Sequence, residues 1–375
     1  MDIKQLREII YKHRKELHSI AEIGQKEFKT SAYIKQYLDE IKVNYKSYLD
    51  TAVVGKINGK IGAKTIAFRA DMDGLTTEDG VEHLCGHDGH MSILLGLVEL
   101  INNNRESLND NIVFIFQPAE EGPGGAEDLI KLGIMKEYKI DEIYGLHIYP
   151  EIPQGTIGIR SGYFLAHVGD VNIDITGKSA HGAMPQNGID SILIASNIIN
   201  SLQSIVSRNI SPIDNAVLTI GKIEGGYRRN IIAENVRLEG TIRAFDPEVY
   251  DNLKTRINEI CKGVELSYNC SVNVHIRDDY PSVKNDKALC KEFIKALEEN
   301  MTEEKIVILD PLMISEDFSY YQKEVPGLFF MLGSRNEEKG FVNGLHNINF
   351  NFDEETLLNG LEIYIKLLKY KKAID

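Results

Sequence analysis

The stretch Thr65-Ile-Ala-Phe-Arg-Ala-Asp71 decides the fold, because it sets an apolar run directly before charged residues. Two later runs end at polar residues in the same way: Ile112–Phe116 before Gln117-Pro118, and Ile143–Leu146 before His147. Short apolar runs of this kind are typical of buried strands in a parallel sheet. Helical stretches at His90–Ile101 and Gly125–Leu132 separate the runs. This alternation predicts an α/β fold whose polar groups gather beyond the carboxyl ends of its strands.

A different pattern begins near Gly169, where apolar and polar residues alternate, and it predicts a second domain. Elements then follow in the order strand, helix, strand, strand, helix, strand: Val171–Ile175, Asp190–Ile205, Ala216–Ile223, Val236–Ile242, Pro247–Cys261 and Val272–Ile276. This order is that of a ferredoxin-like α+β domain. The α/β pattern resumes after Asp279 with three elements: a helix at Asp286–Glu299, a strand at Leu328–Leu332 and a helix at Glu354–Leu368. We therefore expect a discontinuous catalytic domain, residues 1–166 and 279–375, and an inserted domain, residues 167–278.

The composition of the chain indicates a cytoplasmic protein that acts on small molecules. At 375 residues the chain exceeds the size at which one hydrophobic core usually keeps growing, in agreement with two domains. A net charge of −14 disfavours nucleic acid as a partner. The charged amphipathic helix expected at residues 1–19 lacks the apolar core of a signal peptide, and no apolar run has membrane-spanning length. Four irregularly spaced cysteines predict no disulfide framework.

The motif Cys85-Gly-His87 places a thiol and an imidazole two residues apart, just before a predicted helix. Thiolate sulfur and imidazole nitrogen are ligands of zinc and related transition metals, and the glycine lets both side chains turn toward one ion. Taken alone, the motif fits a buried free cysteine beside a helix-capping histidine equally well. The polar residues at the other strand ends decide between these interpretations.

Two adjacent carboxylates, Glu120 and Glu121, follow the strand that ends at Gln117-Pro118. On a turn, one carboxylate can bind a metal while the other takes a proton from the attacking water and returns it to the departing amine. A solvated turn is the alternative for any such pair, but the Gly-Pro-Gly-Gly that follows indicates close approach of another group to the backbone. His147 and His346 add two imidazoles after other predicted strands. So many metal-capable groups at one sheet edge favour a functional site over a structural coincidence.

These residues resemble a known group of metallohydrolases, the superfamily of aminoacylase, carboxypeptidase G and succinyl-diaminopimelate desuccinylase. The chain is most similar to the branch that contains N-acyl-amino-acid, hippurate, indole-acetyl-amino-acid and N-acetyl-diaminopimelate hydrolases. The motifs that carry the resemblance run nearly from end to end: Arg69-Ala-Asp-Met-Asp73, Cys85-Gly-His-Asp-Gly-His90, Gln117-Pro-Ala-Glu-Glu121, Gly145-Leu-His147, Gly177-Lys-Ser-Ala-His-Gly-Ala-Met-Pro185, Asn230-Ile-Ile-Ala-Glu234, Gly240-Thr-Ile-Arg243, Ser315-Glu-Asp-Phe318 and Leu345-His346.

The resemblance implies a zinc-peptidase-like catalytic domain with a mostly parallel central sheet, interrupted by an α+β lid domain. It also implies two divalent metal ions, zinc, manganese, nickel or cobalt, held by five ligands: Cys85, His87, Glu121, His147 and His346. Glu120 is then the general base, and Asp73 orients a ligand. Most relatives outside this branch carry a histidine where this chain has Asp71, and the Cys85 thiolate is expected to replace it.

The inserted domain resembles the lid of this family, which usually also forms the dimer interface, so a homodimer through residues 167–278 is expected. His181 matches the lid histidine that reaches into the partner's site and stabilises the oxyanion. Asn230 and Arg243 match lid residues that hold the substrate, and a guanidinium pairs with a carboxylate at two points. An ordinary surface charge on a strand explains Arg243 equally well, so its role depends on the resemblance.

The sequence therefore predicts an amidohydrolase that uses metal-activated water to remove an N-acyl group from an amino acid or a small peptide-like amide. Deacetylation of N-acetyl-diaminopimelate in lysine biosynthesis and dipeptide hydrolysis are alternative activities. A cysteine hydrolase with Cys85 as nucleophile is a rival enzyme class. A non-catalytic metal-binding protein on the same fold is a second rival, although a binding module has no need of Glu120 as a base. The expected partner is a small N-acyl amino acid, with no nucleic acid and no membrane.

Overall fold

The computed structural model describes residues 3–60, 64–298 and 305–375, and the chain divides into two compact units. Unit 1 comprises Met1–Gly162, Lys284–Asp310 and Asp317–Asp375, and unit 2 comprises Tyr163–Val283 and Pro311–Glu316. The first two residues of the helix expected at residues 1–19, and Glu299 at the end of another, lie outside the described residues.

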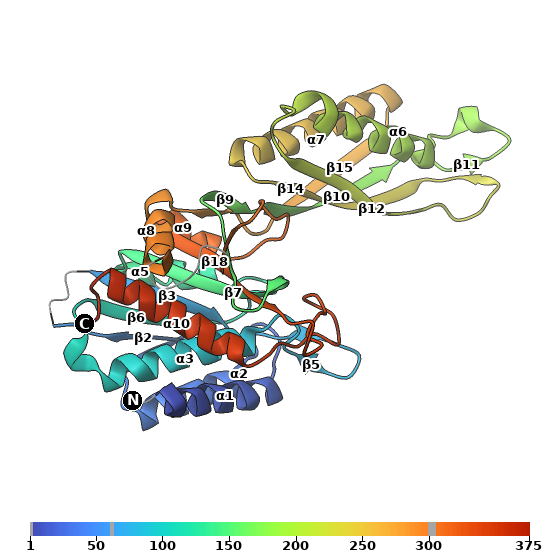
Figure 1. The fold of residues 1–375 in the computed structure, drawn as a ribbon. Coiled ribbons are helices and arrows are strands. Elements are labelled where there is room, and N and C mark those ends of the chain that lie inside the picture. The colour runs from blue at the N-terminus through green and yellow to red at the C-terminus, as the bar shows by residue number, and fades with distance from the viewer. Residues whose placement is uncertain (1–2, 61–63, 299–304) are drawn as a thin grey trace. The chain divides into compact units, whose positions relative to one another are not determined.

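An eight-stranded sheet forms the centre of unit 1 (Figure 1). Its strands, in their order across the sheet, are β1 (Tyr45–Tyr48), β2 (Ala52–Ile57), β6 (Asn111–Gln117), β3 (Thr65–Asp71), β7 (Glu142–Pro153), β18 (Gly327–Arg335), β8 (Ile157–Ile159) and β17 (Ile306–Ile308). The central strands β6, β3, β7 and β18 are parallel, whereas β1 and β2 on one side and β8 on the other pair antiparallel with their inner neighbours. The predicted α/β class with a mainly parallel central sheet is confirmed.

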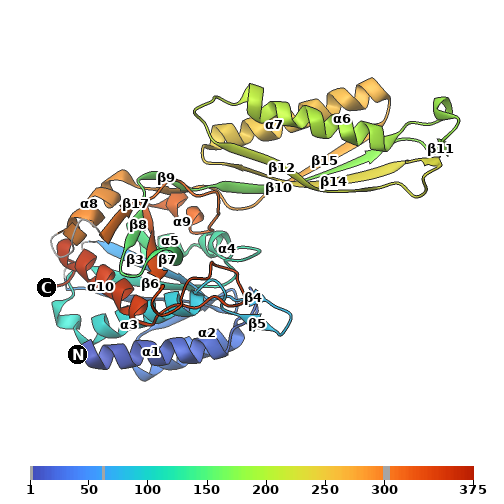
Figure 2. The ribbon, with the colours of Figure 1, turned by 45° about the vertical axis from the view of Figure 1, so that its right-hand side comes forward.

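Helices cover both faces of this sheet (Figures 1 and 2). On one face lie α1 (Ile3–Ser19), α2 (Phe28–Glu40), α3 (His87–Asn103), α8 (Lys287–Glu298) and α10 (Glu355–Tyr370), which share the main apolar core with the strands. On the other face lie α4 (Ala126–Lys131), α5 (Ile134–Tyr138) and α9 (Ser319–Glu324). Because both faces are covered, β3 is buried along its whole length, as a strand in a parallel sheet should be.

Unit 2 is built on a four-stranded antiparallel sheet with the order β12, β14, β10, β15. Its elements along the chain are β10 (His167–Thr176), α6 (Ser191–Ser204), β12 (Ala216–Gly225), β14 (Asn235–Ala244), α7 (Pro247–Tyr268) and β15 (Ser271–Asp278). Both helices pack on one face of the sheet (Figure 2). Each begins at an aspartate cap, with Asp190 accepting from the backbone of α6 and Asp246 from that of α7. The element order is the ferredoxin-like one that the sequence predicts.

Short elements complete the two units: β4 (Leu75–Thr76), β5 (Val81–Glu82), β9 (Gly162–Leu165), β11 (Ala180–His181), β13 (Ile231–Ile232) and β16 (Val283–Asn285). The segment Pro311–Glu316 joins unit 2 through two backbone hydrogen bonds, Leu312 N to Phe164 O at 2.8 Å and Ala166 N to Ile314 O at 2.9 Å. Among the described residues, no helix has both the length and the apolar character that a membrane span requires.

Candidate metal centre

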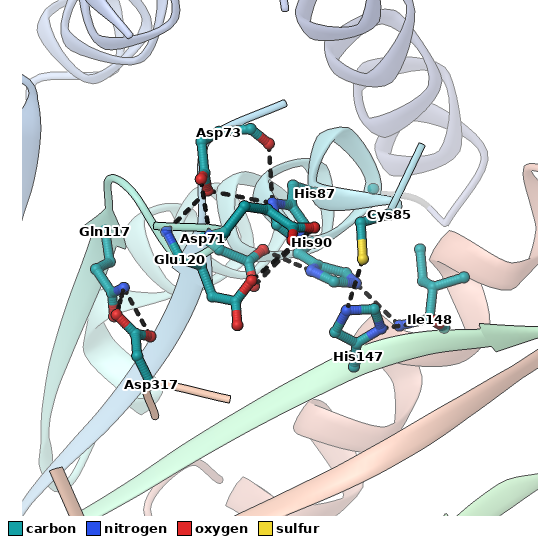
Figure 3. A network of polar contacts seen from close by, with 12 residues as sticks. Asp71, Asp73, Cys85, His87, His90, Gln117, Glu120, His147, Ile148 and Asp317 are labelled. Atoms are coloured by element: carbon teal, nitrogen blue, oxygen red, sulfur yellow. Dashed lines mark hydrogen bonds and ion pairs between the residues drawn. The ribbon is translucent and has the colours of Figure 1, made fainter. Parts of the chain in front are cut away.

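The metal-capable side chains of unit 1 meet where β3 and β6 end and α3 begins (Figure 3). Gly86 is the N-cap of α3 and has a left-handed backbone, with φ of 85°. Glycine adopts this conformation without strain, so the chain can turn into the helix between Cys85 and His87. Cys85 and His87 are both buried, so their donor atoms are withdrawn from bulk water.

His147 lies inside β7, not at the end of a strand as the sequence predicts. The strand β7 continues to Pro153 because it pairs with β18 along that length, whereas its pairing with β3 stops at Gly145. The side chain of His147 therefore lies just past the part of β7 that β3 covers. Within the predicted strand run, Ile143–Leu146, residues 143–145 pair with both β3 and β18.

The five predicted ligands come together in overlapping groups, although they are far apart in the sequence. Cys85 Sγ lies 3.4 Å from His147 Nε2 and 3.3 Å from His346 Nε2. Glu121 Oε1 lies 3.2 Å from the same nitrogen of His346 and 4.0 Å from His87 Nε2. His346 has a left-handed backbone with φ of 64°, and its backbone N–H donates to Leu84 O at 2.8 Å.

Backbone carbonyls fix the orientation of two of the histidines. The Nδ1 atom of His87 lies 2.8 Å from the carbonyl oxygen of Asp73, and Nδ1 of His147 lies 2.7 Å from that of Ile148. A carbonyl can only accept, so Nδ1 of each ring carries a proton and donates it. Nε2 is then the nitrogen left for a ligand, the arrangement found in metal-binding histidines.

The donor atoms fit transition-metal ions. Nε2 of His87 is buried and has no hydrogen-bond partner among the described residues, which is costly unless another ligand binds it. One thiol, three imidazoles and a carboxylate form a donor set that suits zinc, manganese, nickel or cobalt. Burial raises the pKa of the Cys85 thiol, and the charges of Glu121 and Glu120 raise it further. A cation at this site would oppose that shift.

Glu120 and Glu121 lie on a turn of residues 117–126, the acidic turn, whose backbone is held by Asp73. Glu120 N donates to Asp73 Oδ1 at 3.0 Å, and Glu121 N donates to Asp73 Oδ2 at 2.9 Å. Glu120 Oε2 lies 4.0 Å from His87 Nε2, so the two groups face the same space. Asp73 thus contacts His87 through its carbonyl group and holds the backbones of both glutamates through its carboxylate. Figure 3 shows its contacts with His87 and Glu120.

A second layer of buried charge lies behind His87 and was not assigned from the sequence. Asp71 Oδ1 lies 2.6 Å from His90 Nδ1, and Asp71 Oδ2 accepts from Arg69 Nη1 at 2.8 Å. Ile148 N donates to His90 Nε2 at 2.9 Å, so the proton of His90 is on Nδ1 and points at Asp71. Burial lowers the pKa of His90, which agrees with a neutral ring. The three-residue spacing of His87 and His90 on one helix is the signal that could have found this residue.

The three predicted lid residues lie in unit 2 and are not part of the cluster in unit 1. His181 and Asn230 are neighbours, because β11 pairs with β13 and Gly182 N donates to Asn230 O at 2.9 Å. The backbone N–H of Ala183 donates to His181 Nδ1 at 3.1 Å, so the neutral ring carries its proton on Nε2. Arg243 lies at the C-terminal end of β14, and its Nη1 donates to Met313 O at 2.8 Å.

Comparison with known proteins identifies the family. The model of peptidase family M20/M25/M40 matches residues 67–370. The chain belongs to this family. Among curated proteins, N-acetyldiaminopimelate deacetylase from Bacillus cytotoxicus is 40% identical over 372 residues, covering 96% of each chain. The membership that the sequence motifs predict is therefore confirmed.

Solved structures with the same fold include two that cover nearly the whole chain. A proposed aminohydrolase from methicillin-resistant Staphylococcus aureus is 29% identical, with a TM-score of 0.92, and the match covers 98% of this chain and 97% of that one. The YXEP protein of Bacillus subtilis, described as a dinuclear metal-binding peptidase, is 28% identical with a TM-score of 0.84, covering 97% of this chain and 98% of its own.

Proposed function

We propose that this chain is a metal-dependent amidohydrolase that removes the N-acetyl group from an amino acid of the diaminopimelate class. The observation that carries the proposal is the convergence of Cys85, His87, Glu121, His147 and His346, with the Nε2 atoms of two rings left for ligands. Membership of the M20 family and the 40% identity to an N-acetyldiaminopimelate deacetylase support the choice of reaction and of substrate.

The five residues would hold two divalent ions. The relative from Bacillus subtilis is described as a dinuclear metal-binding peptidase. When bound, such ions supply Lewis acidity, which lowers the pKa of water and polarises a carbonyl oxygen. Asp73 has a supporting part, because its carbonyl group orients His87 and its carboxylate holds the acidic turn. Asp71 contacts His90, and His90 accepts from the backbone N–H of Ile148, the residue whose carbonyl group orients His147.

Glu120 acts as the general base and then as the general acid. It accepts a proton from the attacking water, whose oxygen forms a bond to the acyl carbon. It returns that proton to the nitrogen as the C–N bond breaks, which leaves a free amine and acetic acid, and the acid then ionises to acetate and a proton. The position of Glu120 Oε2, 4.0 Å from His87 Nε2, places this carboxylate beside the proposed ligands.

Unit 2 is proposed as the lid, with His181, Asn230 and Arg243 contacting the substrate. His181 suits the oxyanion because its Nε2 carries a proton to donate. In the homodimer that we propose, this residue is supplied by the second copy. Strand β12 is one of the two edge strands of its sheet, and Ile192, Leu193 and Ile223 are exposed apolar residues of unit 2. These features suit association of two copies.

The cytoplasm is the proposed compartment, because a thiol must stay reduced to bind metal and the cytoplasm keeps thiols reduced. All four cysteines are free, and they include Cys85. The proposed catalytic domain is unit 1 and the proposed lid is unit 2, in place of the boundaries at residues 166 and 278 that the sequence pattern suggests.

Chelation followed by metal add-back tests the proposal. The purified chain is stripped with a chelator and assayed for amine release from N-acetyl-diaminopimelate, N-acetyl amino acids, N-succinyl amino acids and dipeptides. We expect activity to disappear and to return with zinc, manganese, nickel or cobalt, with N-acetyl-diaminopimelate the best substrate. Activity that survives complete metal removal would instead favour a cysteine hydrolase. Faster cleavage of dipeptides would overturn the proposed substrate.

A further inference from the structure

The acidic turn needs support from outside itself. It runs from the end of β6 to the start of α4 and carries Glu120 and Glu121. Its backbone is irregular, with positive φ at Ala119, Gly122 and Gly124, so helix and sheet hydrogen bonds do not fix its path. Other groups must therefore hold the two glutamates in place.

Asp317, which has no role in the proposed reaction, binds both ends of this turn. At the first end, Gln117 Nε2 donates to Asp317 Oδ2 at 2.7 Å and to Oδ1 at 2.9 Å. At the other end, the backbone N–H groups of Gly125 and Ala126 both donate to Asp317 Oδ2 at 3.0 Å. One carboxylate thus closes the loop that presents Glu120 and Glu121. Figure 3 shows its contact with Gln117.

Asp317 is itself held rigidly. Its Oδ1 accepts from Arg69 Nη2 at 2.7 Å, and both side chains are buried almost completely. Arg69 also donates through Nε to Gln117 Oε1 at 2.9 Å, and Tyr321 donates to the same oxygen at 3.1 Å. The carboxylate therefore has a compensating charge and fixed partners, so it can act as a stiff anchor.

We infer that Asp317 is a positioning residue that sets the location of Glu120 and Glu121 by closing the acidic turn. This inference rests on the proposed function, because it concerns the proposed base and one proposed ligand. Glu120 and Asp317 also lie close together, with carboxylate oxygens within 4.8 Å of each other. A displacement of about 1 Å at such a site lowers turnover by roughly 10²-fold. A residue that only stabilised unit 1 would leave the turnover of folded molecules unchanged.

The test compares Asp317→Asn with the wild-type chain loaded with zinc or manganese. The amide cannot accept from Gln117, Arg69 and the turn backbone together, because one of its two positions is a donor. We expect kcat to fall roughly 10²-fold with a much smaller change in KM, because the proposed substrate contacts lie in unit 2. We also expect the dissociation constant of the metal, measured by equilibrium dialysis, to rise about 10- to 100-fold because Glu121 is displaced.

Glu142→Gln is the matched control. Glu142 is also a buried carboxylate with a cationic partner, Lys371 at 2.8 Å, but it lies at the start of β7. Its loss should lower the thermal stability while leaving kcat and metal affinity at the wild-type values. The same result for Asp317→Asn, namely lower stability with unchanged kcat and metal affinity, would overturn the inference.

A second variant, Gln117→Met, keeps the test decisive if Asp317→Asn does not fold. It releases only the β6 end of the turn, so we expect losses of kcat and metal affinity in the same direction but smaller. Unchanged values for this variant would also contradict the inference. Metal affinity needs no substrate, so it still tests Asp317 if the wild-type chain binds metal but cleaves none of the amides, an outcome that would refute only the proposed function.

Discussion

The sulfur of Cys85 lies 3.4 Å from Nε2 of His147, yet the two groups are poorly matched as a nucleophile and its base. Burial raises the pKa of the thiol, and nearby carboxylates add to the effect. Burial lowers the pKa of His147 to about 3. Reactive cysteines need the opposite shifts, a lowered thiol pKa beside a basic histidine. The pair is therefore suited to sharing a cation and unsuited to acting as a thiolate nucleophile.

Metal binding should release at least two protons at neutral pH, because ligands must be deprotonated to bind. One comes from the Cys85 thiol. Another comes from His87: burial opposes its charge, but Asp71 and Asp73 outweigh burial and raise its pKa to about 10 in the metal-free chain. His346 adds to the count, because its hydrogen bond to Glu121 raises its pKa. Calorimetric titration of zinc in buffers of different ionisation enthalpy counts the protons. Cys85→Ser should release about one fewer, and equal counts for the two proteins would contradict Cys85 as a ligand.

Exchanging the two neighbouring glutamates for glutamine should separate their roles. Glu120→Gln removes the proton acceptor, so we expect kcat to fall roughly 10²- to 10⁴-fold with metal content unchanged. Glu121→Gln removes a ligand, so we expect weaker metal binding in dialysis. If Glu120→Gln retained wild-type turnover, another group would have to serve as the base.

His181→Ala should lower kcat roughly 10²- to 10³-fold, the usual effect of losing one donor to an oxyanion. His275→Ala is a suitable control, because His275 is an exposed histidine on β15 of the same unit. Activity per chain should also fall on dilution if the second copy supplies His181. A dilution series followed by light scattering checks this, and constant activity in monomeric protein would exclude the shared site.

Glu27 should make the stability of the metal-free chain decrease as the pH rises. It is fully buried and accepts from the backbone N–H of Ala119 at 2.8 Å and from Thr51 at 3.0 Å. Burial raises its pKa from 4.5 to about 7, so the folded chain binds this proton more tightly than the unfolded chain. This contribution to stability is complete below pH 4.5 and is lost as the pH rises through about 7.

Glu27→Gln tests this pH dependence. The free energy of unfolding of the wild-type chain should fall, relative to the variant, between pH 5 and pH 7.5, by up to about 1.4 kcal/mol for each unit of pKa shift. Urea unfolding at the two pH values measures the difference. A constant difference would show that Glu27 binds no extra proton in the folded chain.

The fold was largely predictable because its central strands are buried on both faces. The run Ile112–Phe116 is recognisable as β6 since every residue in it is apolar. Elements at the margins gave no such signal. Strands β8 and β17 have three residues each, too few to show a period, and α2 buries only Ile34 and Leu38 among its apolar residues.

The candidate ligands were predictable from motifs, and so was the supporting part of Asp73, whereas the contacts of Asp317 and His90 were not. Cys85 and His87 lie in one short motif that limits their chemistry. The contact of Gln117 with Asp317 joins residues 200 positions apart. The motif Ser315-Glu-Asp-Phe318 contributes to the family resemblance, but it does not indicate which residues Asp317 contacts. Such partners are chosen by tertiary packing, which brings distant carboxylates to one turn.

The segment Pro311–Glu316 returns to unit 2 after the chain has already re-entered unit 1 at Lys284. Unit 2 is consequently not a single insert that one pair of cuts could excise. A chimaera that exchanged only residues 163–283 with a relative would combine the sheet of that relative with the segment Pro311–Glu316 of this chain. During synthesis on the ribosome, unit 2 also cannot be completed until Glu316 has left the exit tunnel, by which time most of unit 1 has been made.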